Sequence, residues 1–119
     1  MTGAVRRFLR RIREGREQPP FRIEPLHSER GFRLSGDLDM YSVEAARTAL
    51  EPELHGRLVL DLAAVGFIDD SGLGLLVGTL RRLGQQGGSL VLRNPSAPIL
   101  RVLQMTGLEK VPGLTVESP

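Results

Sequence analysis

The fold of this chain is decided at Phe67-Ile68-Asp69-Asp70-Ser71-Gly72-Leu73-Gly74-Leu75-Leu76-Val77-Gly78-Thr79-Leu80-Arg81, where a strand pattern gives way to a helical one. Upstream of this stretch, the unbroken apolar run Leu58-Val59-Leu60 predicts a strand at 57–62 that is covered on both faces or central in its sheet. From Leu73 onward, apolar side chains recur at three- and four-residue spacing, which predicts a helix from about Ser71 to Gln86. Ser71 is therefore expected at a strand-to-helix junction, behind two carboxylates and before a glycine.

On both sides of this junction the body alternates strands with helices. Further strands are expected at 21–26, 32–35, 89–93 and 114–116, and further helices at about 43–50 and 97–106. Such alternation predicts an α/β domain, in which the crossover between the strands at 57–62 and 89–93 is right-handed and parallel. The first two strands are expected to form a hairpin, which makes the sheet mixed. We expect a single domain with about four or five strands flanked by about three or four helices.

The sequence also predicts which residues of this helix are buried and how the segments before it are arranged. The apolar stripe of the helix comprises Leu73, Leu76, Val77, Leu80 and Leu83. Gly74 and Gly78 are expected to let this helix pack closely on a neighbouring element, at a cost of about 1 kcal/mol each in helix propensity. Gly36-Asp37-Leu38-Asp39 is expected to be a turn-like link, and Ser42 is expected to be the N-cap of the helix at 43–50.

The charge of the chain divides it into a basic tail and a mildly acidic body. Residues 1–18 carry six arginines and two glutamates, a net charge of +4, whereas residues 19–119 carry ten basic and twelve acidic groups, a net charge of −2. Pro19 and Pro20 separate the two parts, because neither can donate a backbone hydrogen bond within a helix. We therefore expect an N-terminal extension at 1–18 and a domain at 19–119.

The extension has the pattern of a short amphipathic helix. Val5, Phe8, Leu9 and Ile12 form one stripe, and most of the arginines fall on the other side. Three readings stay open: a frayed or self-docked segment, a surface for a partner, or a peripheral membrane contact, the last two through residues 4–16.

Composition narrows the classes of protein to consider. No apolar run reaches the roughly 18 residues that span a bilayer, and the N-terminus lacks the apolar core of a secretory signal. There are no cysteines, which excludes disulfides and thiolate metal sites. No basic face is evident on the body, as a nucleic-acid-binding domain would need. We expect a cytoplasmic protein without a direct nucleic-acid partner.

Ser71 could act as a helix cap, a nucleophile or a phosphate acceptor. A nucleophilic role is disfavoured, because the Gly-x-Ser-x-Gly elbow is missing and His27 and His55 are poor candidates for its base. The chain has no phosphate-cradling Gly-x-x-x-x-Gly-Lys-Ser/Thr loop, and its aspartates lack the spacing of a calcium loop. No catalytic residue, cofactor or metal ion is therefore expected.

Two roles of Ser71, as a helix cap and as a phosphate acceptor, both remain open on physical grounds. A serine cap contributes about 1 kcal/mol to helix stability. A phosphate on Ser71 would add a charge of about −1.5 to −2 at a helix start, which favours anions, although Asp69 and Asp70 would repel it. The fold could survive this change while the surface lost a protein partner.

Four blocks of the body follow one another in an order that resembles a known family. They are Gly36-Asp37-Leu38-Asp39 and residues 58–74, 88–95 and 102–108. Together they are similar to the STAS domains of bacterial anti-sigma factor antagonists, over roughly residues 21–116. This resemblance implies a mixed sheet flanked by helices. It also implies a switch, in which the unmodified antagonist binds an anti-sigma factor that is also a serine kinase, and so frees a sigma factor.

The resemblance implies a set of site residues. Phosphorylation of the serine matching Ser71 ends binding, and a phosphatase restores it. The partner-binding residues on this reading are Asp37, Asp39, Asp69, Asp70, Gly72 and Leu73. The family often has a serine where Asp70 stands, and a carboxylate there would slow phosphorylation or alter the choice of kinase. The alternative is a non-switched STAS subunit of a membrane transport system, which the basic tail would suit.

Overall fold

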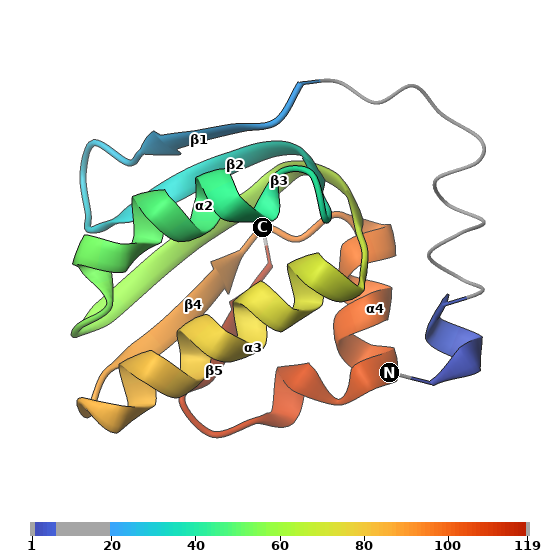
Figure 1. The fold of residues 1–119 in the computed structure, drawn as a ribbon. Helices are drawn as coiled ribbons and strands as arrows, with labels where there is room; N and C mark the ends of the chain where they lie inside the picture. The colour runs from blue at the N-terminus through green and yellow to red at the C-terminus, as the bar shows by residue number, and fades with distance from the viewer. Residues whose placement is uncertain (1, 7–19, 119) are drawn as a thin grey trace.

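The structure is a computed structural model that describes residues 2–6 and 20–118, and its body is one mixed β-sheet with helices packed against it (Figure 1). The strands lie in chain order: β1 (Arg22–Pro25), β2 (Gly31–Leu38), β3 (Arg57–Ile68), β4 (Ser89–Arg93) and β5 (Leu114–Glu117). β1 is antiparallel to β2, and all other neighbours are parallel. The predicted α/β class and mixed sheet are confirmed.

The helices lie in the connections between parallel strands. They are α2 (Val43–Leu50), α3 (Asp70–Gln85) and α4 (Ala97–Thr106), with short 3-10 turns η1 (Glu51–Glu53) and η2 (Leu108–Lys110). Figure 1 shows α2 and α3 side by side across one face of the sheet. The start of α4 is tied to β3, because the Ser96 hydroxyl donates to the carbonyl oxygen of Val65 at 3.1 Å.

Two strands extend beyond their predicted ends. β3 runs twelve residues to Ile68 instead of stopping at 62, and β2 continues through Leu38. The segment 36–39 is therefore mostly the end of a strand, and the expected turn-like link is wrong. Glycine and aspartate are both depleted in strands, so Gly36 and Asp37 conceal this extension in the sequence. Gly36 has a φ of 91°, at a point where the register between β2 and β3 shifts.

The core face of α3 differs in one respect from the predicted stripe. Leu73, Leu76, Leu80 and Leu83 are buried as expected, but Val77 is 37% exposed. Leu75 and Thr79 are buried instead. The reason is that α3 packs on two neighbours, the sheet and α2, so its buried surface is wider than a single stripe and is displaced toward α2.

An ion-pair network joins the β1–β2 turn to the last two strands. Arg93 on β4 contacts Glu29 in the turn and lies 2.8 Å from Glu117 Oε1 on β5. Arg57 approaches the same two carboxylates at 3.4 Å. The hydrogen bond from Arg93 is the main cause that lowers the pKa of Glu29, and Arg57 adds to it.

We expect this network to make stability depend on pH in acid. The pKa of Glu29 is lowered in the folded state, so its contribution is present above the unfolded value of about 4.3 and is lost as the pH falls through the lower folded value. Glu29→Gln should therefore flatten the fall of the thermal midpoint below about pH 4.3. Glu24→Gln removes an exposed carboxylate 4.0 Å from Arg22 and serves as the control. Identical acid slopes in both variants would contradict the assignment.

Candidate functional site

The junction between β3 and α3 is held by the carboxylate of Asp69. Its Oδ1 accepts a hydrogen bond from the Gly72 amide at 3.0 Å, which makes Asp69 the N-cap of α3. Its Oδ2 accepts from the Met40 amide at 3.1 Å, in the link between β2 and α2. One side chain thus caps a helix and fastens a second segment beside it. Of the two roles left open for Ser71, the helix cap is wrong, because α3 begins at Asp70 and Ser71 lies within its first turn.

Ser71 is half-buried at the second position of α3. Among the described residues, none forms a hydrogen bond with its hydroxyl group. Because Asp69 supplies the cap, the fold does not depend on the Ser71 hydroxyl. Its neighbour Asp70 is exposed. An anion on the Ser71 oxygen would lie at the positive end of the α3 dipole, next to two carboxylates of the same sign.

Gly72 marks the closest approach of α3 to the end of β2. A Cβ atom at this position would lie 2.3 Å from the carbonyl oxygen of Leu38 and 2.6 Å from Cγ1 of Ile68. The absence of a side chain is therefore a packing requirement. The next residue, Leu73, is buried in the core.

The link between β2 and α2 is organised by buried polar groups. Asp39 Oδ1 accepts hydrogen bonds from the amides of Tyr41 at 3.0 Å and Ser42 at 3.2 Å. The Ser42 hydroxyl donates to the carbonyl oxygen of Asp37 at 2.7 Å and accepts from the Asp39 amide at 2.9 Å. Ser42 holds the predicted N-cap position of α2, but its side chain makes no capping bond there. Both aspartates are only 4% exposed.

The same link presents two large apolar side chains that sequence reasoning missed. Met40 is 61% exposed and Tyr41 is 80% exposed. The Met40 amide donates a hydrogen bond to Asp69, so this part of the link lies close to the start of α3. A signal existed in the sequence, because two large apolar residues in a short strand-to-helix link are unusual if nothing contacts them.

The structure therefore divides the seven predicted site residues by depth. Asp37, Asp39, Gly72 and Leu73 are buried, Asp69 and Ser71 are intermediate, and Asp70 is exposed. The junction brings Asp69, Asp70, Ser71, Gly72 and Leu73 together with the β2–α2 link. The surface itself consists of Ser71 and Asp70, with Met40 and Tyr41 nearby, while the buried members hold the backbone beneath it.

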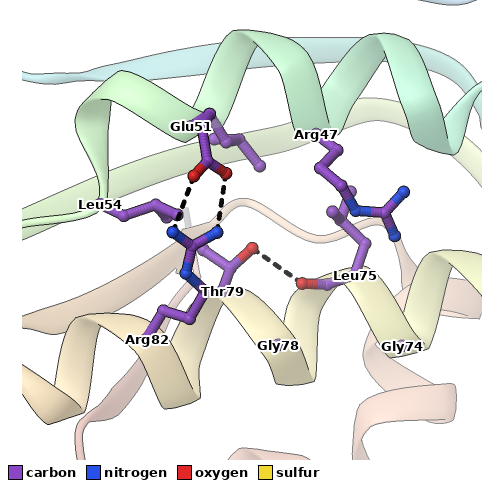
Figure 2. Close-up of a pocket in the computed structure, with 9 residues that line it drawn as sticks. Arg47, Glu51, Leu54, Gly74, Leu75, Gly78, Thr79 and Arg82 are labelled. Atoms are coloured by element: carbon purple, nitrogen blue, oxygen red, sulfur yellow. Dashed lines mark hydrogen bonds and ion pairs between the residues drawn. The ribbon is translucent and has the colours of Figure 1, made fainter.

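A groove runs between α2 and α3 (Figure 2). One end is closed by Arg82, which forms a two-pronged ion pair with Glu51 at 2.7 and 2.8 Å. Gly74 and Gly78 line the groove, and a Cβ atom at either would meet nothing within 4 Å. The expectation that these glycines permit close packing is wrong. The helix approaches its neighbour at Gly72 instead, and the two later glycines leave α3 open.

A second groove lies on the other side of α3, toward α4 and η2. It is mainly apolar and is lined by Asp70, Leu73, Gly74, Val77, Leu80, Thr106, Leu108 and Val111. Val77 and Val111 are both more than a third exposed. The groove begins at the carboxylate that precedes Ser71.

The described part of the N-terminal tail docks on the body. Residues 3–6 are helical, and Val5 is only 2% exposed within the same buried cluster as the core. The Nε atom of Arg6 lies 3.2 Å from Oδ2 of Asp70. For residues 2–6 the self-docked reading is therefore confirmed. Phe8, Leu9 and Ile12, the rest of the predicted stripe, lie outside the described residues.

Residues 2–6 and 20–118 contain neither a cluster of metal-ligating side chains nor a helix that could span a membrane. Within these ranges no three histidine, aspartate or glutamate side chains are grouped so that they could hold a metal ion. No helix of this part of the chain combines the length and apolar character needed to cross a membrane.

Comparisons with known proteins agree in one family. The protein-family model described as the STAS domain matches residues 22–118. The anti-sigma-B factor antagonist of Bacillus subtilis (strain 168) is 36% identical over 87 residues, which cover 71% of this chain and 80% of the relative. Two solved structures of SpoIIAA are 29% identical and cover 83% of this chain. The first is the anti-sigma factor antagonist in its unphosphorylated form. It superposes on this chain with a TM-score of 0.66, and 89% of it is covered. The second is the Bacillus cell fate determinant in its phosphorylated form, with a TM-score of 0.62 and 92% of it covered.

Proposed function

This chain belongs to the STAS domain family, and we propose that it acts as an anti-sigma factor antagonist that is switched off by phosphorylation of Ser71. In the unmodified state it binds an anti-sigma factor that is also a serine kinase, and this frees a sigma factor. A phosphatase reverses the modification. The role is one of regulated binding in the cytoplasm, without catalysis by this chain. Support comes from relatives named antagonists and from a relative whose structure is described in both phosphorylation states.

The observation that carries this proposal is the local independence of the Ser71 hydroxyl. It is half-buried, it has no hydrogen-bond partner among the described residues, and Asp69 performs the capping that a serine could have performed. The kinase would transfer the γ-phosphoryl group of ATP to Oγ, with loss of the hydroxyl proton and release of ADP. Because phosphorylation breaks no hydrogen bond that holds the domain together, the phosphorylated protein keeps its fold. Only the charge of its surface changes.

The partner surface of this proposal centres on Ser71 and Asp70. Met40 and Tyr41 extend it with exposed apolar area, and such area beside a polar site is typical of protein-binding surfaces. The buried residues Asp37, Asp39, Gly72 and Leu73 would act by shaping the backbone beneath, together with Asp69. Their assignment to partner binding stays a prediction.

Incubation with the anti-sigma factor kinase and Mg-ATP tests the proposal. We expect phosphate to enter the wild-type chain and to be absent from Ser71→Ala, which should still bind the anti-sigma factor. The stability of Ser71→Ala should stay within about 0.5 kcal/mol of wild type, because Asp69 provides the cap. Ser28→Ala, at an exposed serine in the β1–β2 turn, is the matched control and should incorporate phosphate normally. Unchanged phosphorylation of Ser71→Ala would show that the acceptor lies elsewhere.

A further inference from the structure

We propose that residues 2–6 are an intramolecular competitor, which occupies the surface beside Ser71 and must leave before the protein partner can bind. This inference rests on the proposed function, because the competing partner is the anti-sigma factor. It assigns a role to the tail that the STAS match at 22–118 does not cover.

The docked turn has one apolar anchor and one charge. Val5 is 2% exposed, whereas Thr2, Gly3 and Ala4 of the same segment are exposed. The turn is closed on itself, since the Val5 amide donates to the Thr2 hydroxyl at 3.3 Å and the Arg6 amide to the Thr2 carbonyl at 3.2 Å. Within residues 2–6, Val5 is the buried side chain, and Arg6 forms an ion pair with the body.

The charge fixes where the turn docks. Arg6 lies 3.2 Å from Asp70, and Asp70 immediately precedes Ser71 on α3. Asp70 also begins the apolar groove between α3 and α4. A partner that contacts Ser71 and Asp70 would meet the guanidinium of Arg6 already in place. The two occupants therefore exclude each other at this carboxylate.

The ion pair holds the turn only weakly. Both members of the Arg6–Asp70 pair are about half exposed, at 60% and 49%, and such pairs contribute little to stability. Val5 is the one buried residue within residues 2–6. When a surface is available only part of the time, the apparent affinity of a partner falls in proportion to the available fraction. The docked turn would thus set a threshold for partner binding.

Docking itself can be measured through a single thiol. The chain has no cysteine, so Val5→Cys and Ala4→Cys each carry one thiol on the same turn. With a maleimide reagent, Val5→Cys should label more slowly than Ala4→Cys, each normalised to its rate in denaturant. Adding Asp70→Asn should raise the Val5→Cys rate about two- to fivefold, as expected for loss of an exposed ion pair. Equal normalised rates for the two thiols would overturn the proposal.

Competition is measured with the purified anti-sigma factor on the full chain. Val5→Asp should bind it about three- to tenfold more tightly than wild type, because the surface is no longer occupied. Ala4→Asp places the same charge on the exposed side of the turn and should bind like wild type. A saturating amount of the anti-sigma factor should also speed labelling of Val5→Cys.

The outcomes separate the two proposals. If the anti-sigma factor binds but neither affinity nor labelling responds to it as described, competition is refuted and the proposed function stands. If the wild-type chain and every variant fail to bind, the proposed function fails and the competition fails with it. The labelling rates would still decide whether the turn docks.

Discussion

Replacing Gly72 with alanine is expected to destabilise the domain by about 1–3 kcal/mol, with a larger loss if the backbone must move. The new Cβ would lie 2.3 Å from a backbone carbonyl oxygen, that of Leu38, which cannot rotate away as a flexible side chain would. The same oxygen is 3.3 Å from the Asp69 amide, so a shift there would also disturb the junction. Unfolding in urea, followed by circular dichroism, measures the loss.

Gly74→Ala is the matched control for this prediction. It lies two residues later on α3, is exposed, and has nothing within 4 Å of its Cβ position. Alanine is favoured over glycine by about 1 kcal/mol in a helix interior, so Gly74→Ala should stabilise the domain. The two substitutions are chemically identical and should have opposite signs. A similar change in both would contradict the close contact at Gly72.

Replacing Asp69 with alanine is expected to cost about 2 kcal/mol, the second largest effect predicted for this domain. The change removes a helix cap, which contributes about 1 kcal/mol, and a charge-assisted hydrogen bond to the Met40 amide, which contributes a comparable amount. Because the second bond joins two segments, the Met40 amide should also exchange its hydrogen faster. Chemical denaturation and amide exchange measure the two consequences separately.

Asp70→Ala is the control for Asp69→Ala. Asp70 is the next carboxylate in the chain, but its ion pair with Arg6 is about half exposed. Its loss should therefore cost less than about 1 kcal/mol and leave exchange at Met40 unchanged. If Asp70→Ala proved as destabilising as Asp69→Ala, the special position of Asp69 would be refuted.

The order of the elements could be predicted from the sequence because each one has a clear local pattern. The apolar run Leu58-Val59-Leu60 and the helical spacing after Ser71 identify β3 and α3 without reference to the rest of the chain. The cap of α3 could not be identified in this way. Aspartate and serine are about equally good caps, so local preference does not separate Asp69 from Ser71. The Met40 amide, 29 residues away in the chain, favours Asp69.

The roles of the glycines in α3 depend on contacts that the sequence does not reveal. Gly72, Gly74 and Gly78 all fit a helix that packs closely on something. In the structure it is Gly72 that makes the close contact. The rotation of α3 about its axis is fixed by burial against both the sheet and α2. This turns Gly72 toward a carbonyl oxygen of β2, a strand that is distant in the sequence. Partner contacts are harder still to predict, since a buried aspartate such as Asp39 can match a family position while it serves the fold.

The order of the strands in the sheet, β1-β2-β3-β4-β5, has a consequence for how the protein is made. During synthesis the N-terminal part of a chain is available for folding before the rest has been made. Here each newly synthesised strand pairs with the strand made just before it, so the nascent chain can extend its sheet at one edge. We expect the ribosome-bound chain to gain structure in steps, and to be complete only when the short strand Leu114–Glu117 has left the exit tunnel.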